Sequence, residues 1–268
     1  MHDAILAQPE ALVKAIERNR DEVEELASLI ASRGRIFLAG IGTSHHASLV
    51  GEHLMRAYGG GPDVRAVHSF DLALLAGRLG YHRTGSDTLP DGLLLEELPE
   101  ALRAALGKEE EVAALAREHV GRRRIWLVGG GPSAVTATET ALKIKETSYL
   151  QAEGMPTETM LHGPFQCVEA DDLFVLVAPS GGARERTLEV AELAEEVGVP
   201  FLIFGDDRIE GRLAALTVPG VPEPLSALTC LVPLQLFAYH LALTRGTNPD
   251  NFRVDDPRFA RADVSGRF

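Results

Sequence analysis

Four residues between Glu139 and Pro164 have side chains that could carry acid–base chemistry. Glu139, Lys143 and Glu146 stand at positions i, i+4 and i+7, so a helix would place them on one face. His162 follows sixteen residues after Glu146, in a Leu-His-Gly-Pro turn. A carboxylate can move a proton between carbons beside a carbonyl, an imidazole can open a sugar ring, and an ammonium can stabilise a developing oxyanion. The alternative is a solvated helix face with a Glu–Lys pair, because runs of charge usually face water.

The composition excludes several classes of function. The net charge of -13 over 268 residues disfavours nucleic acid and acidic membranes as partners. There is no run of 18 apolar residues and no secretory signal pattern at the N-terminus, so we expect a cytoplasmic protein. Cys167 and Cys230 are expected to be buried free thiols. Neither has a Cys or His at ligand spacing, and no His-Glu-x-x-His occurs, so we expect no metal.

Two segments of the chain repeat each other without gaps. RIFLAGIGTSHHASLV and RIWLVGGGPSAVTATE align at an offset of 89 residues (124 minus 35). Each copy reads as a strand, a Gly-x-Gly turn, a serine and a helix, whose N-terminus would direct free N–H groups at a ligand. His45 and Ala134 stand where a dinucleotide fold needs a third glycine, so we expect no cofactor. His45 and His46 are interpreted as exposed polar residues near a helix start.

The remaining pattern predicts an α/β protein with parallel sheets. Strands are expected at 35–40, 64–67, 124–128, 173–178, 201–204 and near 218, and helices at 9–33, 46–58, 97–120 with a break near Gly107, 183–197 and 224–245. The last helix is apolar almost all round, so we expect it to be buried. The second half of the chain holds enough elements for a complete five-stranded unit. The first half reads as a reduced copy, and the alternative is one mixed sheet made by both halves.

Three segments together resemble a known family: RIFLAGIGTSHHASLVGEHLM, TALKIKETSYLQAEGMPTETMLHGP and LVPLQLFAYHLALTRGTNPD. They are similar to the double sugar-isomerase (SIS) domain proteins, above all to the isomerase half of glucosamine-6-phosphate synthase and to stand-alone phosphosugar isomerases and deaminases. The resemblance implies three-layer flavodoxin-like units, a reduced one within 1–110 and a complete one within 111–246, followed by a tail at 247–268. It also implies a homodimer that binds a small sugar phosphate.

The resemblance assigns roles to the residues named above. Glu146 would move the proton between C1 and C2, Lys143 would lie beside the substrate as a catalytic group, and His162 would reach in from a neighbouring subunit to help open the ring. The expected substrate-binding residues are Gly42, Thr43, Ser44, Glu139 and Ser180.

Three departures from the family pattern bear on the activity. The Ser-x-Ser-Gly-x-Thr phosphate loop is not found, and its nearest candidate, residues 84–88, has no strand before it. The tail has no lysine to form a Schiff base; Arg258 or Arg261 falls near that place, and arginine cannot do amine chemistry. No glutaminase domain is found, so we do not expect a complete glutamine-dependent synthase. We expect an isomerase or deaminase of a hexose or hexosamine 6-phosphate; the alternative is a non-catalytic, regulatory phosphosugar-binding protein.

Overall fold

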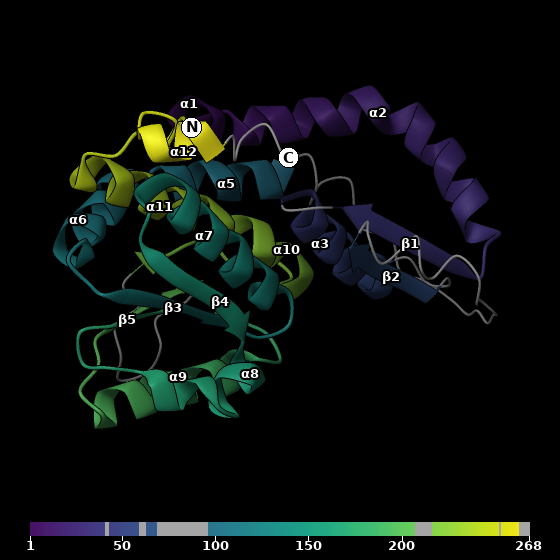
Figure 1. Cartoon of the computed structure of the whole chain (residues 1–268). Coiled ribbons are helices and arrows are strands. Elements are labelled where there is room, and N and C mark those ends of the chain that lie inside the picture. Colours follow the sequence, from purple (N-terminus) through teal and green to yellow (C-terminus); the bar gives the residue numbers. More distant parts are fainter. Residues whose placement is uncertain (41–42, 59–62, 69–95, 207–215, 252, 263–268) are drawn as a thin grey trace.

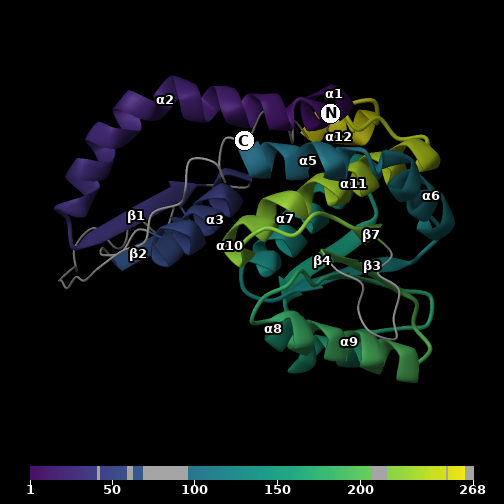
Figure 2. The ribbon, with the colours of Figure 1, turned by 180° about the vertical axis from the view of Figure 1, so that it is seen from behind.

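The computed structural model describes residues 1–40, 43–58, 63–68, 96–206, 216–251 and 253–262 (Figure 1). Two separate parallel sheets flank a group of helices that contains α3 (Thr43–Tyr58), α7 (Pro132–Ser148) and α10 (Glu223–Thr229). These three helices contact one another, so the two units of the chain meet through them (Figures 1 and 2). The predicted α/β fold with parallel sheets is confirmed, and the alternative of one mixed sheet is wrong for the described residues.

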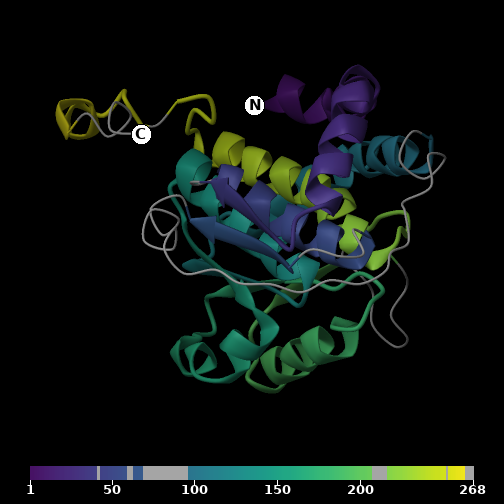
Figure 3. The same ribbon diagram turned by 90° about the vertical axis from the view of Figure 1, so that its right-hand side faces the viewer.

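The larger sheet has five parallel strands in the order β4-β3-β5-β6-β7. Helices α7, α10 and α11 cover one face, and α8 and α9 cover the other, so the second unit is the three-layer arrangement that was expected (Figure 3). The bounds are β3 (Arg124–Gly129), β4 (Gln151–Pro156), β5 (Leu173–Val177), β6 (Phe201–Gly205), β7 (Leu216–Thr217), α8 (Thr157–Leu161), α9 (Arg184–Glu196) and α11 (Leu231–Arg245).

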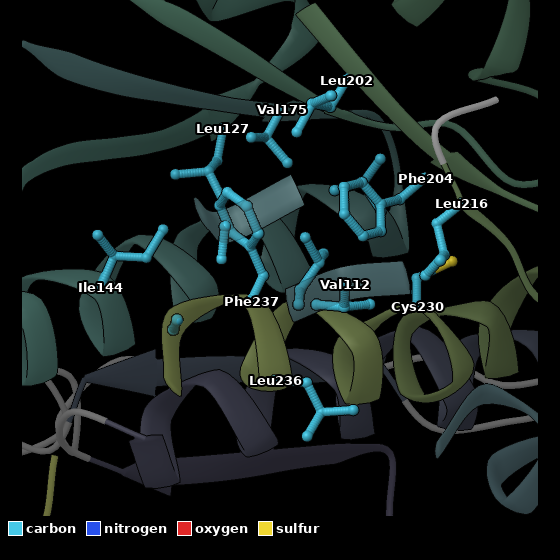
Figure 4. Packing of buried hydrophobic residues seen from close by; sticks show 14 of the residues in the cluster. Val112, Leu127, Ile144, Val175, Leu202, Phe204, Leu216, Cys230, Leu236 and Phe237 are labelled. Atoms are coloured by element: carbon cyan, nitrogen blue, oxygen red, sulfur yellow. The ribbon is translucent and has the colours of Figure 1, made fainter. Parts of the chain in front are cut away.

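Alternation along the central strands builds two cores, one on each face of this sheet. Leu127 and Val175, paired in register across β3 and β5, contribute to the core beneath α7 and α11 (Figure 4). Their neighbours Trp126 and Phe174 contribute to the core beneath α9. Both faces are therefore buried, which explains why these strands read as continuous apolar runs in the sequence.

Strand β4 was not predicted, because QAEGMP contains no β-branched or aromatic residue. It pairs with β3 at the edge of the sheet, and Gly154 lies opposite Leu127. A Cβ atom at residue 154 would lie 2.4 Å from the carbonyl oxygen of Ala137 in α7. Glycine at this position therefore lets α7 pack closely on β4. Tyr149 ends α7 in the left-handed conformation and so turns the chain into the strand.

The apolar segment near the C-terminus forms two helices rather than the single one predicted. Helix α10 ends at Thr229 and α11 begins at Leu231, because Pro233 has no N–H to donate to the carbonyl of Thr229. Residues 223–245 are long and apolar enough to pass for a membrane span by composition, yet 61% of their most apolar stretch is buried within the protein. The expected burial is confirmed, and the segment serves as a core element here.

The smaller sheet pairs β1 (Arg35–Gly40) with β2 (Asp63–His68) in parallel, and α3 packs on both strands. Helix α2 (Gln8–Ala31) follows the short α1 (His2–Leu6) and extends from the larger unit to the smaller one (Figure 1). Residues 69–95, which contain the candidate phosphate loop, lie outside the described residues. Helices α5 (Leu98–Leu106) and α6 (Glu109–His119) confirm the predicted helices and the break at Gly107. The proposed domain boundaries stay predictions.

The two thiols differ in their surroundings. Cys230 is completely buried, and this burial raises the pKa of its thiol to about 12. Cys167 is exposed, so the expectation that both thiols are buried is wrong for this residue. Both are free, as predicted.

Candidate functional site

The charged residues of α7 form one continuous row, as their spacing predicted. The Lys143 ammonium donates a hydrogen bond of 2.6 Å to Glu146 Oε2 and lies 3.7 Å from Glu139 Oε1. Glu139 is only 4% exposed, whereas Lys143 and Glu146 are partly exposed. A solvated helix face is therefore the wrong interpretation at Glu139, because a carboxylate is buried at such a position only where it has partners.

Those partners come from the first unit of the chain. Thr43, the first residue of α3, donates from Oγ1 to Glu139 Oε1 at 3.2 Å. His46, one turn further on, bonds Glu139 Oε2 through Nδ1. A carboxylate oxygen accepts hydrogen bonds, so we assign the donor role in this contact to Nδ1. Thr43 and Glu139, both predicted to bind substrate, are thus brought together. Ser44 follows Thr43 at the start of α3, and Gly42 lies outside the described residues.

The sequence analysis missed His46, which it interpreted as an exposed residue near a helix start. The side chain is mostly buried, and its partner is 93 residues away in the sequence. One signal was available in the internal repeat: at the offset of 89, His46 corresponds to Val135. A polar residue in one copy and an apolar residue in the other mark a position where the two copies serve different purposes.

Two cavities adjoin the charged row. One of about 340 Å³ lies between α3, α7, α10 and α11 and is mainly apolar, with Thr43, His46 and Glu139 supplying polar groups. The other, of about 400 Å³, is lined by Lys145, Glu146 and residues of the tail. Each end of the row is thus accessible to a small molecule: Glu139 lines the first cavity, and Glu146 lines the second.

The tail contributes Arg253 to the cavity beside Glu146. Its guanidinium lies 4.8 Å from the ring centre of Tyr149 and 4.3 Å from that of Phe259, so it is held between two aromatic faces. Arg258 instead bonds Asp256, and Arg261 donates to a backbone carbonyl of α12 (Pro257–Ala262). The tail arginine that shares a cavity with Glu146 is therefore Arg253, rather than Arg258 or Arg261.

His162 is not brought to the charged row within one chain. It follows α8, on the opposite face of the sheet from α7 (Figure 1). The side chain is 74% exposed, and its Nε2 lies 3.3 Å from Glu158 Oε2 of the same short helix, α8. Any role for His162 beside Glu146 thus requires a second subunit, which is the arrangement implied by the resemblance.

Ser180 belongs to a different cluster, at the carboxyl end of β5. Its hydroxyl donates to Asp206 Oδ1 at 3.0 Å and accepts from Arg184 Nη1 at 2.7 Å. The crevice between β3 and β5 lies here, where open α/β sheets usually bind ligands. Glu223 fills it: its Oε1 accepts from the amide of Gly182 at 3.1 Å, and the remaining space is only about 10 Å³. The structure does not join Ser180 to the row of α7.

Comparison with known proteins identifies a domain within the chain. The SIS domain family matches residues 120–245 of this chain. The chain contains a SIS domain. It is homologous to the isomerase part of the glutamine–fructose-6-phosphate aminotransferase of Pyrococcus horikoshii, with 28% identity over 332 aligned positions that cover 93% of this chain. The chain spans 55% of that relative's length. Because the alignment is longer than the chain of 268 residues, the relative has segments with no counterpart here.

Solved structures share the SIS fold over almost the whole chain. The C-terminal domain of glucosamine-fructose-6-phosphate aminotransferase from Francisella tularensis superposes with a TM-score of 0.79 and 17% identity, covering 92% of this chain and 96% of its own. Tagatose-6-phosphate ketose/aldose isomerase from Escherichia coli superposes with a TM-score of 0.71 and 16% identity, covering 92% of this chain and 93% of its own. Glucosamine-6-phosphate deaminase from Thermotoga maritima superposes with a TM-score of 0.63 and 17% identity, covering 93% of this chain and 96% of its own. The expected SIS fold is confirmed.

Proposed function

We propose that this SIS protein is an isomerase or deaminase that transfers a proton between C1 and C2 of a hexose or hexosamine 6-phosphate. The observation that carries the proposal is the row Glu139–Lys143–Glu146, whose buried end is tied to the first residues of α3. Homology to the isomerase part of an aminotransferase and the fold shared with a ketose/aldose isomerase and a deaminase support the same reaction class.

The proton transfer that we assign to the row needs only its own side chains. The Glu146 carboxylate takes a proton from C1 or C2 of the open-chain sugar, and the electron pair of that C–H bond forms an enediolate. The Lys143 ammonium, shared between two carboxylates, stabilises the negative oxygen. The proton then returns from Glu146 to the neighbouring carbon, while the hydroxyl proton of the second oxygen passes to the negative first oxygen, so that carbonyl and hydroxyl exchange places. The hydroxyls of Thr43 and Ser44 and the backbone N–H groups at the start of α3 would hold the phosphate.

The alternative is a phosphosugar-binding protein without turnover. It is favoured by the arginine that stands in the tail beside Glu146, because Arg253 cannot form the Schiff base that a lysine could. Binding would then depend on the turn at Thr43 and Ser44, while the charged row would only orient the sugar. This alternative differs from the enzyme in one measurable respect, which is catalysis after binding.

Calorimetric titration with fructose 6-phosphate, glucose 6-phosphate and glucosamine 6-phosphate, followed by turnover assays on each sugar that binds, separates the two. We expect at least one sugar to bind and to be converted. Binding without conversion would favour the regulatory alternative, and absence of binding by all of them would contradict both.

We further propose that the protein works in the cytoplasm as a homodimer in which His162 reaches the partner's charged row. Free Cys167 and Cys230 support a reducing compartment. On helix α2 the apolar residues Val23, Leu26 and Leu29 form a stripe that is 50–55% exposed in one chain. Covering this stripe with a second copy would remove apolar surface from water.

Light scattering at micromolar concentration is expected to give the mass of two chains, about twice 28.9 kDa. Val23→Asp combined with Leu26→Asp should shift the protein to monomers, since charges would be buried in the contact. A monomeric wild type would contradict this proposal and the role of His162 in trans.

A further inference from the structure

The internal repeat relates four residues that meet between the two units. At the offset of 89, His46 corresponds to Val135 and Val50 corresponds to Glu139. His46 and Val50 lie on α3, Val135 and Glu139 lie on α7, and all four line the same cavity of about 340 Å³. The helix of each copy therefore contributes the same two repeat positions to this shared cavity.

One of the two equivalent pairings is polar and the other is apolar. His46 of α3 bonds Glu139 of α7, whereas their counterparts Val135 of α7 and Val50 of α3 can make only apolar contacts. The counterpart positions thus carry apolar side chains in the same cavity between these helices. A buried carboxylate with a histidine partner is no better for stability than well-packed apolar side chains, because both groups lose their hydration. Packing alone therefore does not explain why a histidine and a glutamate occupy positions 46 and 139.

The contacts of Glu139 indicate what the polar pairing does. Oε2 is held by His46, and Oε1 accepts from Thr43 and faces the Lys143 ammonium at 3.7 Å. Lys143 makes its short bond of 2.6 Å to Glu146 instead. With Glu139 fixed toward α3, the ammonium stays near Glu146. Without His46, the Glu139 carboxylate would be free to turn to Lys143 and compete for it.

We propose that His46 is a positioning residue, which holds Glu139 toward the first unit and thereby keeps Lys143 at Glu146. This inference rests on the proposed function, because it gives His46 a part in the same proton transfer. It also joins the first copy of the repeat to the chemistry of the second. Nδ1 is the nitrogen that matters, so an asparagine, whose amide nitrogen lies close to that position, should replace histidine better than valine does.

The first test compares His46→Val and His46→Asn. We expect kcat of the valine variant to fall by roughly tenfold to hundredfold, as for a misplaced catalytic group, with KM changed little because the hydroxyls assigned to the phosphate, those of Thr43 and Ser44, are kept. Asparagine should restore most of kcat. The matched control is His240→Val, which removes another partly buried histidine–glutamate pair, with Nε2 3.0 Å from Glu109 Oε1, and should leave kcat unchanged. An unchanged kcat in His46→Val, or no recovery with asparagine, would overturn the proposal.

The second test needs no turnover, so it separates this proposal from the proposed function. Urea unfolding is measured for His46→Val, Lys143→Met and the double variant. His46 and Lys143 both act on Glu139, so the double variant should lose more stability than the two single losses add up to. In His46→Val the Glu139 carboxylate can still pair with Lys143. In the double variant it has lost both partners, so the extra destabilisation appears only there. Additive losses would overturn the proposal, whether or not any sugar phosphate is converted.

Discussion

Replacing Glu146 by glutamine is expected to lower the rate of C1–C2 proton transfer by roughly 10²- to 10⁴-fold, the usual contribution of a positioned base. Glutamine has nearly the same shape and can still accept the hydrogen bond that Lys143 gives at 2.6 Å, but it cannot take a proton from carbon. Affinity for the sugar phosphate should change little, because the groups assigned to the phosphate lie at the start of α3. Steady-state rates and calorimetric affinities measure the two quantities separately.

The control for this prediction is Glu196→Gln, an exposed carboxylate at the end of α9 on the opposite face of the sheet. It should keep the wild-type rate and affinity. If Glu146→Gln converts substrate as fast as wild type, Glu146 is only a charge on the helix surface, and the central assignment fails.

The second large effect is expected in the core rather than at the site. Phe237 is completely buried in α11 and meets the edge of Phe204, with 6.3 Å between ring centres (Figure 4). Phe237→Ala should lower the free energy of unfolding by about 3–5 kcal/mol, because it removes apolar contacts and leaves a cavity between α11 and the sheet. Urea denaturation measures this loss.

Leu243→Ala on the same helix is the comparison, since Leu243 is 48% exposed. Its effect should be within about 0.5 kcal/mol of zero, as for most surface substitutions. A loss below about 1 kcal/mol for Phe237→Ala would mean that α11 does not close this core.

The sequence predicted most of the fold because apolar periodicity and glycine turns are local signals. The glycine turn between β3 and α7, the buried strands of the second unit and the break at Gly107 were all predicted in this way. Strand β4 could not be predicted from the sequence, because its pairing with β3, rather than its composition, makes it a strand. The break before α11 had a local signal, Pro233, whose effect the strong apolar pattern concealed.

The site was predictable only along α7. Helical spacing placed Glu139, Lys143 and Glu146 on one face, and the structure brings them into contact. Whether that face was buried depended on α3, which is far away in the sequence, so the burial of Glu139 and its bond to His46 could not be predicted. His162 is exposed in the single chain, and its role beside a partner's charged row stays a prediction.

The most direct test of the central claim is incorporation of solvent deuterium into a bound sugar phosphate. Wild-type protein is incubated in heavy water with fructose 6-phosphate or glucosamine 6-phosphate, and deuterium at C1 and C2 is followed by NMR, with Glu146→Gln in parallel. We predict deuterium at C1 or C2 with the wild type and a rate lower by roughly 10²- to 10⁴-fold with the variant. A wild type that binds either sugar by calorimetry yet introduces no deuterium, or a variant that matches the wild type, would contradict proton transfer by Glu146.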